Sequence, residues 1–150
     1  SSAQDTARVI IVATTDIHGR VTHWDYENDR EAPWGLTRAA TVVDSLRRRY
    51  PGQVVLVDAG DLIQGNPFAA YFGTVRPVQP HPVIDALNAL AYDVAAPGNH
   101  EFNFGLDLLE RAVGDAAFAV VRRYVRADED GPGDCDGSRH RRPRFGGATV

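Results

Sequence analysis

The chain has 150 residues, 43% of them hydrophobic, so it can bury one sizeable core and is too short for two ordinary domains. Its formal net charge of -4 argues against a nucleic-acid polymer or an anionic membrane as partner, because such binders neutralise phosphates with a basic face. We expect no transmembrane segment, no signal peptide in residues 1–8 and no intramolecular disulfide, since Cys135 is the single cysteine.

Strand-like and helix-like segments alternate along the chain. Residues 9–13 form a continuous apolar run, which favours a parallel strand covered on both faces over an edge strand. Apolar residues then recur at helical spacing over residues 36–50, and Pro51-Gly52 ends that helix. Further strands are predicted at 54–57, 94–96 and 117–121, and further helices at 83–90 and at 106–113 with Leu106, Leu109 and Val113 inward.

This alternation predicts the α/β fold class, with a largely parallel sheet and helices packed on it through right-handed crossovers. Binding sites in such sheets form beyond the carboxyl ends of the strands. Three polar clusters follow directly after predicted strands, so we expect all three to converge on one edge of the sheet.

The chain changes character after Val121, where arginine, acidic residues and glycine replace the apolar periodicity. We therefore divide it into a flexible N-terminus (1–8), one folded unit (9–121) and an Arg-rich tail of low hydrophobicity (122–150). A disordered tail and the truncated or frame-shifted end of a longer chain both stay open as interpretations of the last segment.

The first polar cluster contains Asp16 and His18, two positions apart after the first strand. An extended Asp-x-His aims both side chains the same way, and a carboxylate beside an imidazole suits Mn, Fe, Zn or Co. Polar residues after strands are often only caps or turn formers, so this pair alone is a weak signal.

The second cluster contains Asp58, Gly60 and Asp61. Gly60 allows a sharp turn from which the carboxylate of Asp61 can project and bridge two cations. Spacing alone leaves Asp58 open as the ligand, and a structural Gly-Asp turn is also common.

The third cluster, Gly98-Asn99-His100-Glu101, is the most specific of the three. Asn99 offers a neutral oxygen ligand, and His100 can donate a proton or a hydrogen bond to a phosphate oxygen. A turn with a surface histidine is the alternative for this cluster by itself.

With these residues in view, the sequence resembles the calcineurin-like metallophosphoesterases, whose pattern runs Asp-x-His, Gly-Asp, Gly-Asn-His-Asp/Glu. The resemblance covers about residues 9–121 and implies the N-terminal half of an α/β/β/α sandwich. It also implies two divalent ions (Mn, Zn, Fe, Co or Mg), with Asp16 and His18 on the first, Asp61 bridging and Asn99 on the second. His100 would then lie near the leaving-group oxygen of a phosphoester substrate.

A narrower resemblance is to the 5'-nucleotidase branch, and within it to bacterial 2',3'-cyclic-nucleotide 2'-phosphodiesterase/3'-nucleotidases. Residues 61–67, 81–83 with 86–88, and 98–107 carry this likeness. Asn103 is the informative position, because typical 5'-nucleotidases have Asp there and the cyclic branch tends to have Asn, so the match favours the cyclic branch. An amide stabilises an imidazolium less than a carboxylate does, so His100 should be a weaker base here. A 5'-nucleotidase or nucleotide-sugar hydrolase is the alternative.

The resemblance implies further histidine ligands that this chain lacks. His23 is expected in a polar loop, His81 at a helix start, and His140 among arginines that would repel a cation. An inactive fragment with exposed apolar sheet surface is therefore a further alternative. The family likeness implies a periplasmic, cell-surface or secreted location.

Overall fold

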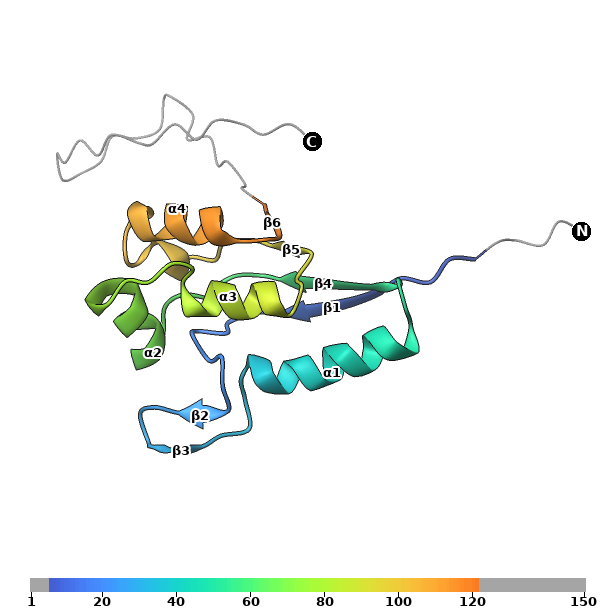
Figure 1. Cartoon of the computed structure of the whole chain (residues 1–150), viewed down its shortest axis with the longest axis horizontal. Coiled ribbons are helices and arrows are strands. Elements are labelled where there is room, and N and C mark those ends of the chain that lie inside the picture. The colour runs from blue at the N-terminus through green and yellow to red at the C-terminus, as the bar shows by residue number, and fades with distance from the viewer. Residues whose placement is uncertain (1–5, 122–150) are drawn as a thin grey trace, which may run out of the picture.

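A parallel four-stranded sheet organises the molecule, in a computed structural model that describes residues 6–121 (Figure 1). Its strand order is β1 (Ile10–Thr14), β4 (Val54–Asp58), β5 (Val94–Ala95) and β6 (Ala119–Val120). The register places Thr14 opposite Asp58 and Asp58 opposite Ala95, so the carboxyl ends of three strands meet at one edge. The predicted α/β class with a largely parallel sheet is confirmed; the predicted tail lies outside the described residues.

Three longer helices connect the strands: α1 (Leu36–Arg49), α3 (Pro82–Ala89) and α4 (Leu106–Asp115). Their bounds agree with the predicted helices to within two residues, because glycine and proline mark most of their ends. None of the helices within residues 6–121 is both long and apolar enough to cross a membrane.

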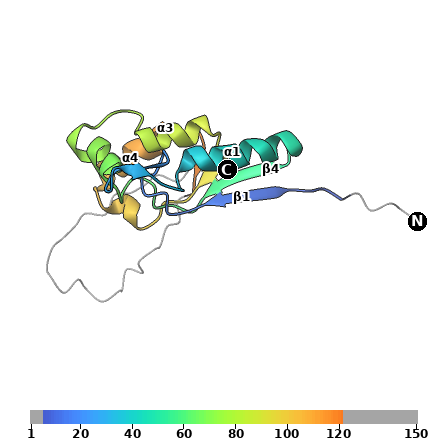
Figure 2. The same cartoon turned by 90° about the horizontal axis from the view of Figure 1, so that it is seen from below.

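Helices α1 and α3 cover one face of the sheet, as Figure 2 shows for the strands β1 and β4. The core between these layers contains the fully buried side chains Val43, Leu56, Ile63, Val83 and Leu87. The opposite face is open within the described part of the chain, where Ile11 is 70% exposed. The expectation that the first strand is covered on both faces is therefore wrong here, since β1 lies at the sheet edge and pairs with β4 alone among the described strands.

Helix α4 buries Leu108, Leu109 and Ala112, whereas Leu106 and Val113 are only partly buried. The predicted inward set was thus right only for Leu109. The buried stripe is rotated because Leu108 and Ala112 join Ile84 and Leu87 of α3 in the core.

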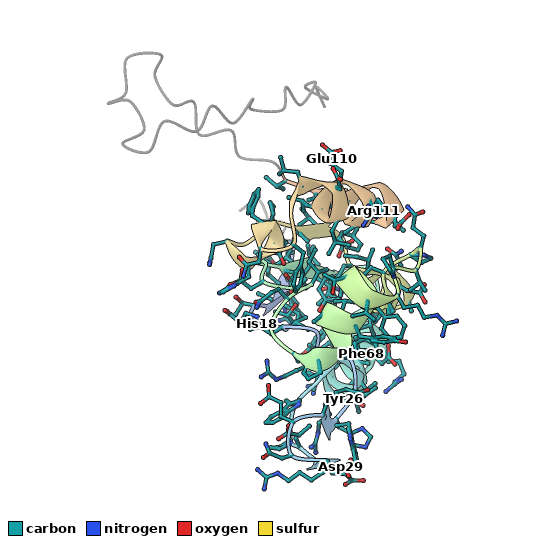
Figure 3. The ribbon with its side chains drawn as sticks, turned by 90° about the vertical axis from the view of Figure 1, so that its left-hand side faces the viewer. His18, Tyr26, Asp29, Phe68, Glu110 and Arg111 are labelled. Atoms are coloured by element: carbon teal, nitrogen blue, oxygen red, sulfur yellow. The ribbon has the colours of Figure 1, made fainter. Side chains whose placement is uncertain are left out.

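Short elements between the longer ones were not predicted. They are the antiparallel pair β2 (Trp24–Asp25) and β3 (Arg30–Glu31), the helix α2 (Pro67–Ala70), a π-helix (Tyr71–Val75) and a 3₁₀ helix (His100–Phe102). Tyr26 of the β2–β3 turn stacks on Phe68 of α2 with ring centroids 5.7 Å apart, and Figure 3 shows the two side chains together. This contact fixes the hairpin against the segment that follows the second polar cluster.

Candidate metal centre

The loops after β1 and β4 are joined backbone to backbone. The N–H groups of Asp16, His18 and Gly19 donate to the carbonyl oxygens of Gly60, Asp61 and Leu62 at 3.0, 2.8 and 2.8 Å. Parallel pairing of β1 with β4 thus continues past the strand ends. The first and second polar clusters are held together by main-chain geometry, before any side chain contributes.

The backbone is strained where the acidic and imidazole side chains project. Asp16, His18 and Asp61 have φ values of 54°, 48° and 62°, and these are three of the five non-glycine residues with positive φ in the described part. Such left-handed conformations cost on the order of 1–3 kcal/mol each and cluster at functional sites. In these backbone conformations, all three side chains project from the loops toward a common point.

One ligand atom from each of Asp16, His18 and Asp61 lies within 4.8 Å of the other two. Nδ1 of His18 is 2.8 Å from the carbonyl oxygen of Gln64; because a carbonyl only accepts, Nδ1 carries the proton. Nε2 then has its lone pair free and lies 3.7 Å from Oδ1 of Asp16. A donor set of two carboxylates and a backbone-oriented imidazole fits a divalent transition-metal ion.

His100 reaches the same point from the loop after β5. Its backbone N–H donates to Oδ1 of Asp61 at 2.8 Å, and its ring centroid lies 5.3 Å from that of His18. Nδ2 of Asn103 is 3.0 Å from Nδ1 of His100. An amide NH₂ only donates, so in this arrangement Nδ1 accepts and a neutral ring carries its proton on Nε2.

Asn99 is exposed and directly precedes the 3₁₀ helix that begins at His100. Its side chain makes no capping hydrogen bond to that helix, so local structure does not occupy its amide oxygen. The structure therefore gathers Asp16, His18, Asp61, His100 and Asn103 through recorded contacts, and places Asn99 beside them in the chain.

The carboxylate of Glu101 links two loops of this site through backbone hydrogen bonds, a role that was not predicted from the sequence. Its side chain is 4% exposed, and its carboxylate accepts from the backbone N–H groups of Asp61 (2.7 Å), Gly98 (2.5 Å), Ile63 (3.3 Å) and Leu62. One buried charge thus ties the loop after β4 to the loop after β5. The acidic residue closing the third motif was the available signal for it.

Asp58, the alternative ligand left open by spacing, is buried away from the cluster. Its carboxylate accepts from Oγ1 of Thr14 at 2.6 Å and from the N–H of Gly60 at 2.7 Å, and Thr14 also contacts the hydroxyl of Tyr92. Burial raises the pKa of Asp58 to about 6, against the lowering effect of the Thr14 hydrogen bond. Asp58 therefore supports the sheet end, while Asp61 projects to the surface.

The other two histidines within residues 6–121 lie apart from the cluster. His23 is exposed and pairs with Glu31 at 3.8 Å in the β2–β3 hairpin. His81 is 2% exposed and caps α3 by accepting from the N–H of Val83, and burial lowers the pKa of its ring. His140 lies outside the described residues.

An α/β sheet that presents carboxylates and imidazoles at its carboxyl edge, with an amide-oriented histidine beside them, defines a metallophosphoesterase-type protein. Residues 10–135 match the family model of the calcineurin-like phosphoesterases. The chain belongs to this family, whose members are phosphoesterase and nucleotidase enzymes.

Three relatives illustrate the likeness. The trifunctional nucleotide phosphoesterase protein YfkN of Bacillus subtilis is 41% identical over 132 residues, which is 83% of this chain and 9% of that protein. Its crystal structure aligns with a TM-score of 0.71 at 42% identity, over 75% of this chain and 36% of that one. The 2',3'-cyclic-nucleotide 2'-phosphodiesterase/3'-nucleotidase of Haemophilus influenzae is 45% identical over 77% of this chain and 18% of its own length. Bovine 5'-nucleotidase is 33% identical over 78% of this chain and 20% of its own length. The chain thus spans a fifth or less of these curated relatives.

Proposed function

We propose that the protein is a metal-dependent hydrolase of nucleotide phosphoesters, acting on 2',3'-cyclic nucleotides and 3'-nucleotides. The observation that carries this proposal is the convergence of Asp16, His18 and Asp61 within 4.8 Å, with His100 bonded to Asp61 through its backbone. The higher identity to the cyclic phosphodiesterase (45%) than to the 5'-nucleotidase (33%) supports the choice of substrate.

In this proposal Asp16 and His18 would hold one divalent ion and Asn99 a second, with Asp61 as a ligand of both. The chemistry that such ions would supply is a nucleophile from water near neutral pH and neutralisation of the charge on the phosphoryl oxygens. The Gln64 carbonyl accepts from Nδ1–H of His18 and so leaves Nε2 as the atom that would bind a metal ion, and the Glu101 carboxylate fixes the backbone of Asp61.

His100 acts on the substrate through Nε2. Because Asn103 donates to Nδ1, the Nε2–H of the neutral ring is available to donate to a phosphoryl or leaving-group oxygen. Asn103 is a positioning residue in this reading, since it acts on the substrate only through the orientation and tautomer of His100.

The test is hydrolysis of 2',3'-cyclic AMP, 3'-AMP and 5'-AMP by the purified protein with added manganese. The proposal requires turnover of the first two substrates, and its loss in Asp61→Asn, which controls for contaminating phosphatase. Preference for 5'-AMP would instead support the second candidate, a 5'-nucleotidase. Absence of turnover with all three in a folded, metal-loaded protein would refute catalysis by this chain and favour an inactive fragment.

A further inference from the structure

Arg20 lies beside the metal cluster and is half-buried. It lines a cavity of about 390 Å³ together with Thr15, Asp16 and Trp34. Of the arginines in the described part of the chain, it alone shares that cavity with Asp16. Arg20 therefore borders the same cavity as one of the candidate metal ligands.

The backbone of Arg20 is fixed on both sides. Its N–H donates to the carbonyl oxygen of Ile17 at 2.9 Å, and its own carbonyl oxygen accepts from the N–H of Leu36 at 3.0 Å. The first bond belongs to the turn that carries His18, and the second joins the first turn of α1. The position of Arg20 relative to the cluster is thus set by the main chain.

The guanidinium is oriented by an aromatic ring. Cζ of Arg20 lies 5.3 Å from the centroid of the Trp34 ring, and no carboxylate within residues 6–121 is paired with it. Stacking occupies a face of a guanidinium and leaves the N–H groups on its edge for an acceptor. A stacked, unpaired guanidinium has the geometry that binds two oxygens of a phosphate at once.

The charge balance of the cavity favours an anion once the cluster is loaded. Asp16 is the acidic residue lining it, and a divalent ion on Asp16 would neutralise that carboxylate. Arg20 and Trp34 also line a second cavity, which contains Asp25 and Glu27, but no carboxylate within residues 6–121 lies at ion-pair distance from the Arg20 guanidinium. A bound oxyanion would balance the positive charge of Arg20.

We propose that Arg20 is a substrate-binding residue that donates to anionic oxygens of the bound phosphoester, and of the phosphate product, in the cavity next to Asp16. This assignment rests on the proposed function and adds to it a residue that favours charged phosphoesters. It also explains why the guanidinium is stacked on Trp34 rather than paired with an acid.

The test compares Arg20→Ala, Arg20→Lys and Arg20→Met with Arg48→Ala, a control on the exposed far end of α1. In the zinc- or manganese-loaded full-length protein, we expect Arg20→Ala to raise both KM for 2',3'-cyclic AMP and the inhibition constant of inorganic phosphate by about 10-fold or more. Arg20→Lys keeps the positive charge but not the planar guanidinium, so KM and the inhibition constant should rise less than in Arg20→Ala. Arg48→Ala should change neither constant.

A direct binding measurement separates this inference from the proposed function. Calorimetric titration of the metal-loaded protein with inorganic phosphate needs no turnover, and the inference requires the affinity to fall in Arg20→Ala but not in Arg48→Ala. Equal phosphate affinity in all variants overturns it, as does a fall in kcat with KM and phosphate inhibition unchanged. If Arg20→Ala does not fold, Arg20→Met gives the answer, because it keeps an apolar stem over Trp34.

Discussion

Replacing Glu101 with glutamine tests whether one buried carboxylate holds the metal site together. The substitution keeps the size of the side chain and changes one carboxylate oxygen into an NH₂ group. Oε2 accepts from Asp61 and Gly98, and Oε1 accepts from Leu62 and Ile63. Whichever oxygen is replaced, the new NH₂ faces two backbone N–H donors.

The expected loss of stability follows from those two donors. Each becomes a buried, unsatisfied N–H group, at a cost of about 1–3 kcal/mol, so Glu101→Gln should lower the free energy of unfolding by about 2–6 kcal/mol. The affinity for manganese should also fall, by about 10- to 100-fold, because the backbone of Asp61 loses its anchor.

Urea-induced unfolding and calorimetric titration with manganese measure these two effects. Glu110→Gln is the matched control, since Glu110 is exposed on α4 and points outward in Figure 3. Its free energy of unfolding should stay within about 0.5 kcal/mol of the unsubstituted protein. If Glu101→Gln behaves like this control, the bracing role assigned to the carboxylate is wrong.

Three further predictions concern neighbouring positions. A Cβ on Gly98 would overlap the carboxylate of Asp61, so Gly98→Ala should lower manganese affinity about 10-fold or more by calorimetry, whereas Gly114→Ala, with open space around it, should not. Because burial raises the pKa of Asp58 to about 6 from 3.8, the metal-free protein should lose about 1–2 kcal/mol of stability as pH rises from about 4 to 6, after allowance for solvent screening. In Asp58→Asn the free energy of unfolding should not show that loss over the same pH range. If the variant loses as much stability as the unsubstituted protein, the loss does not come from Asp58. Asn103→Ala releases the ring of His100 and should lower kcat about 10-fold or more with little change in KM, in steady-state kinetics with 2',3'-cyclic AMP; equal losses of affinity and rate would place Asn103 in substrate binding instead.

The longer elements could be predicted because their sequence signals are local. Helix α1 ends where Pro51 and Gly52 prevent its continuation, and α3 begins at Pro82 after the His81 cap. The apolar run of β1 predicted a strand, but its place at the sheet edge depends on which strands pair, and no local pattern contains that information.

Only the site residues that belong to sequence motifs could be predicted. Asp16, His18, Asp61 and His100 were placed near one another because each follows a strand of a parallel sheet. The roles of Gln64 and Thr14 were not predicted, since a backbone carbonyl and a buried hydroxyl gain their functions from tertiary contacts. The stacking of Tyr26 on Phe68 was missed for the same reason, because the two rings are far apart in the sequence.

The metal site and the fold depend on one another through the same few groups. Asp16, His18 and Asp61 hold left-handed backbone conformations, and two carboxylates share a space 4.8 Å across, so the metal-free loops carry both strain and charge repulsion. The hydrogen bonds between the loops after β1 and β4, together with the Glu101 carboxylate, offset that cost. A divalent ion would remove the repulsion without relaxing the backbone, and the free energy of its binding therefore adds to that of folding. The strained turns are stable because the sheet below them fixes both of their ends.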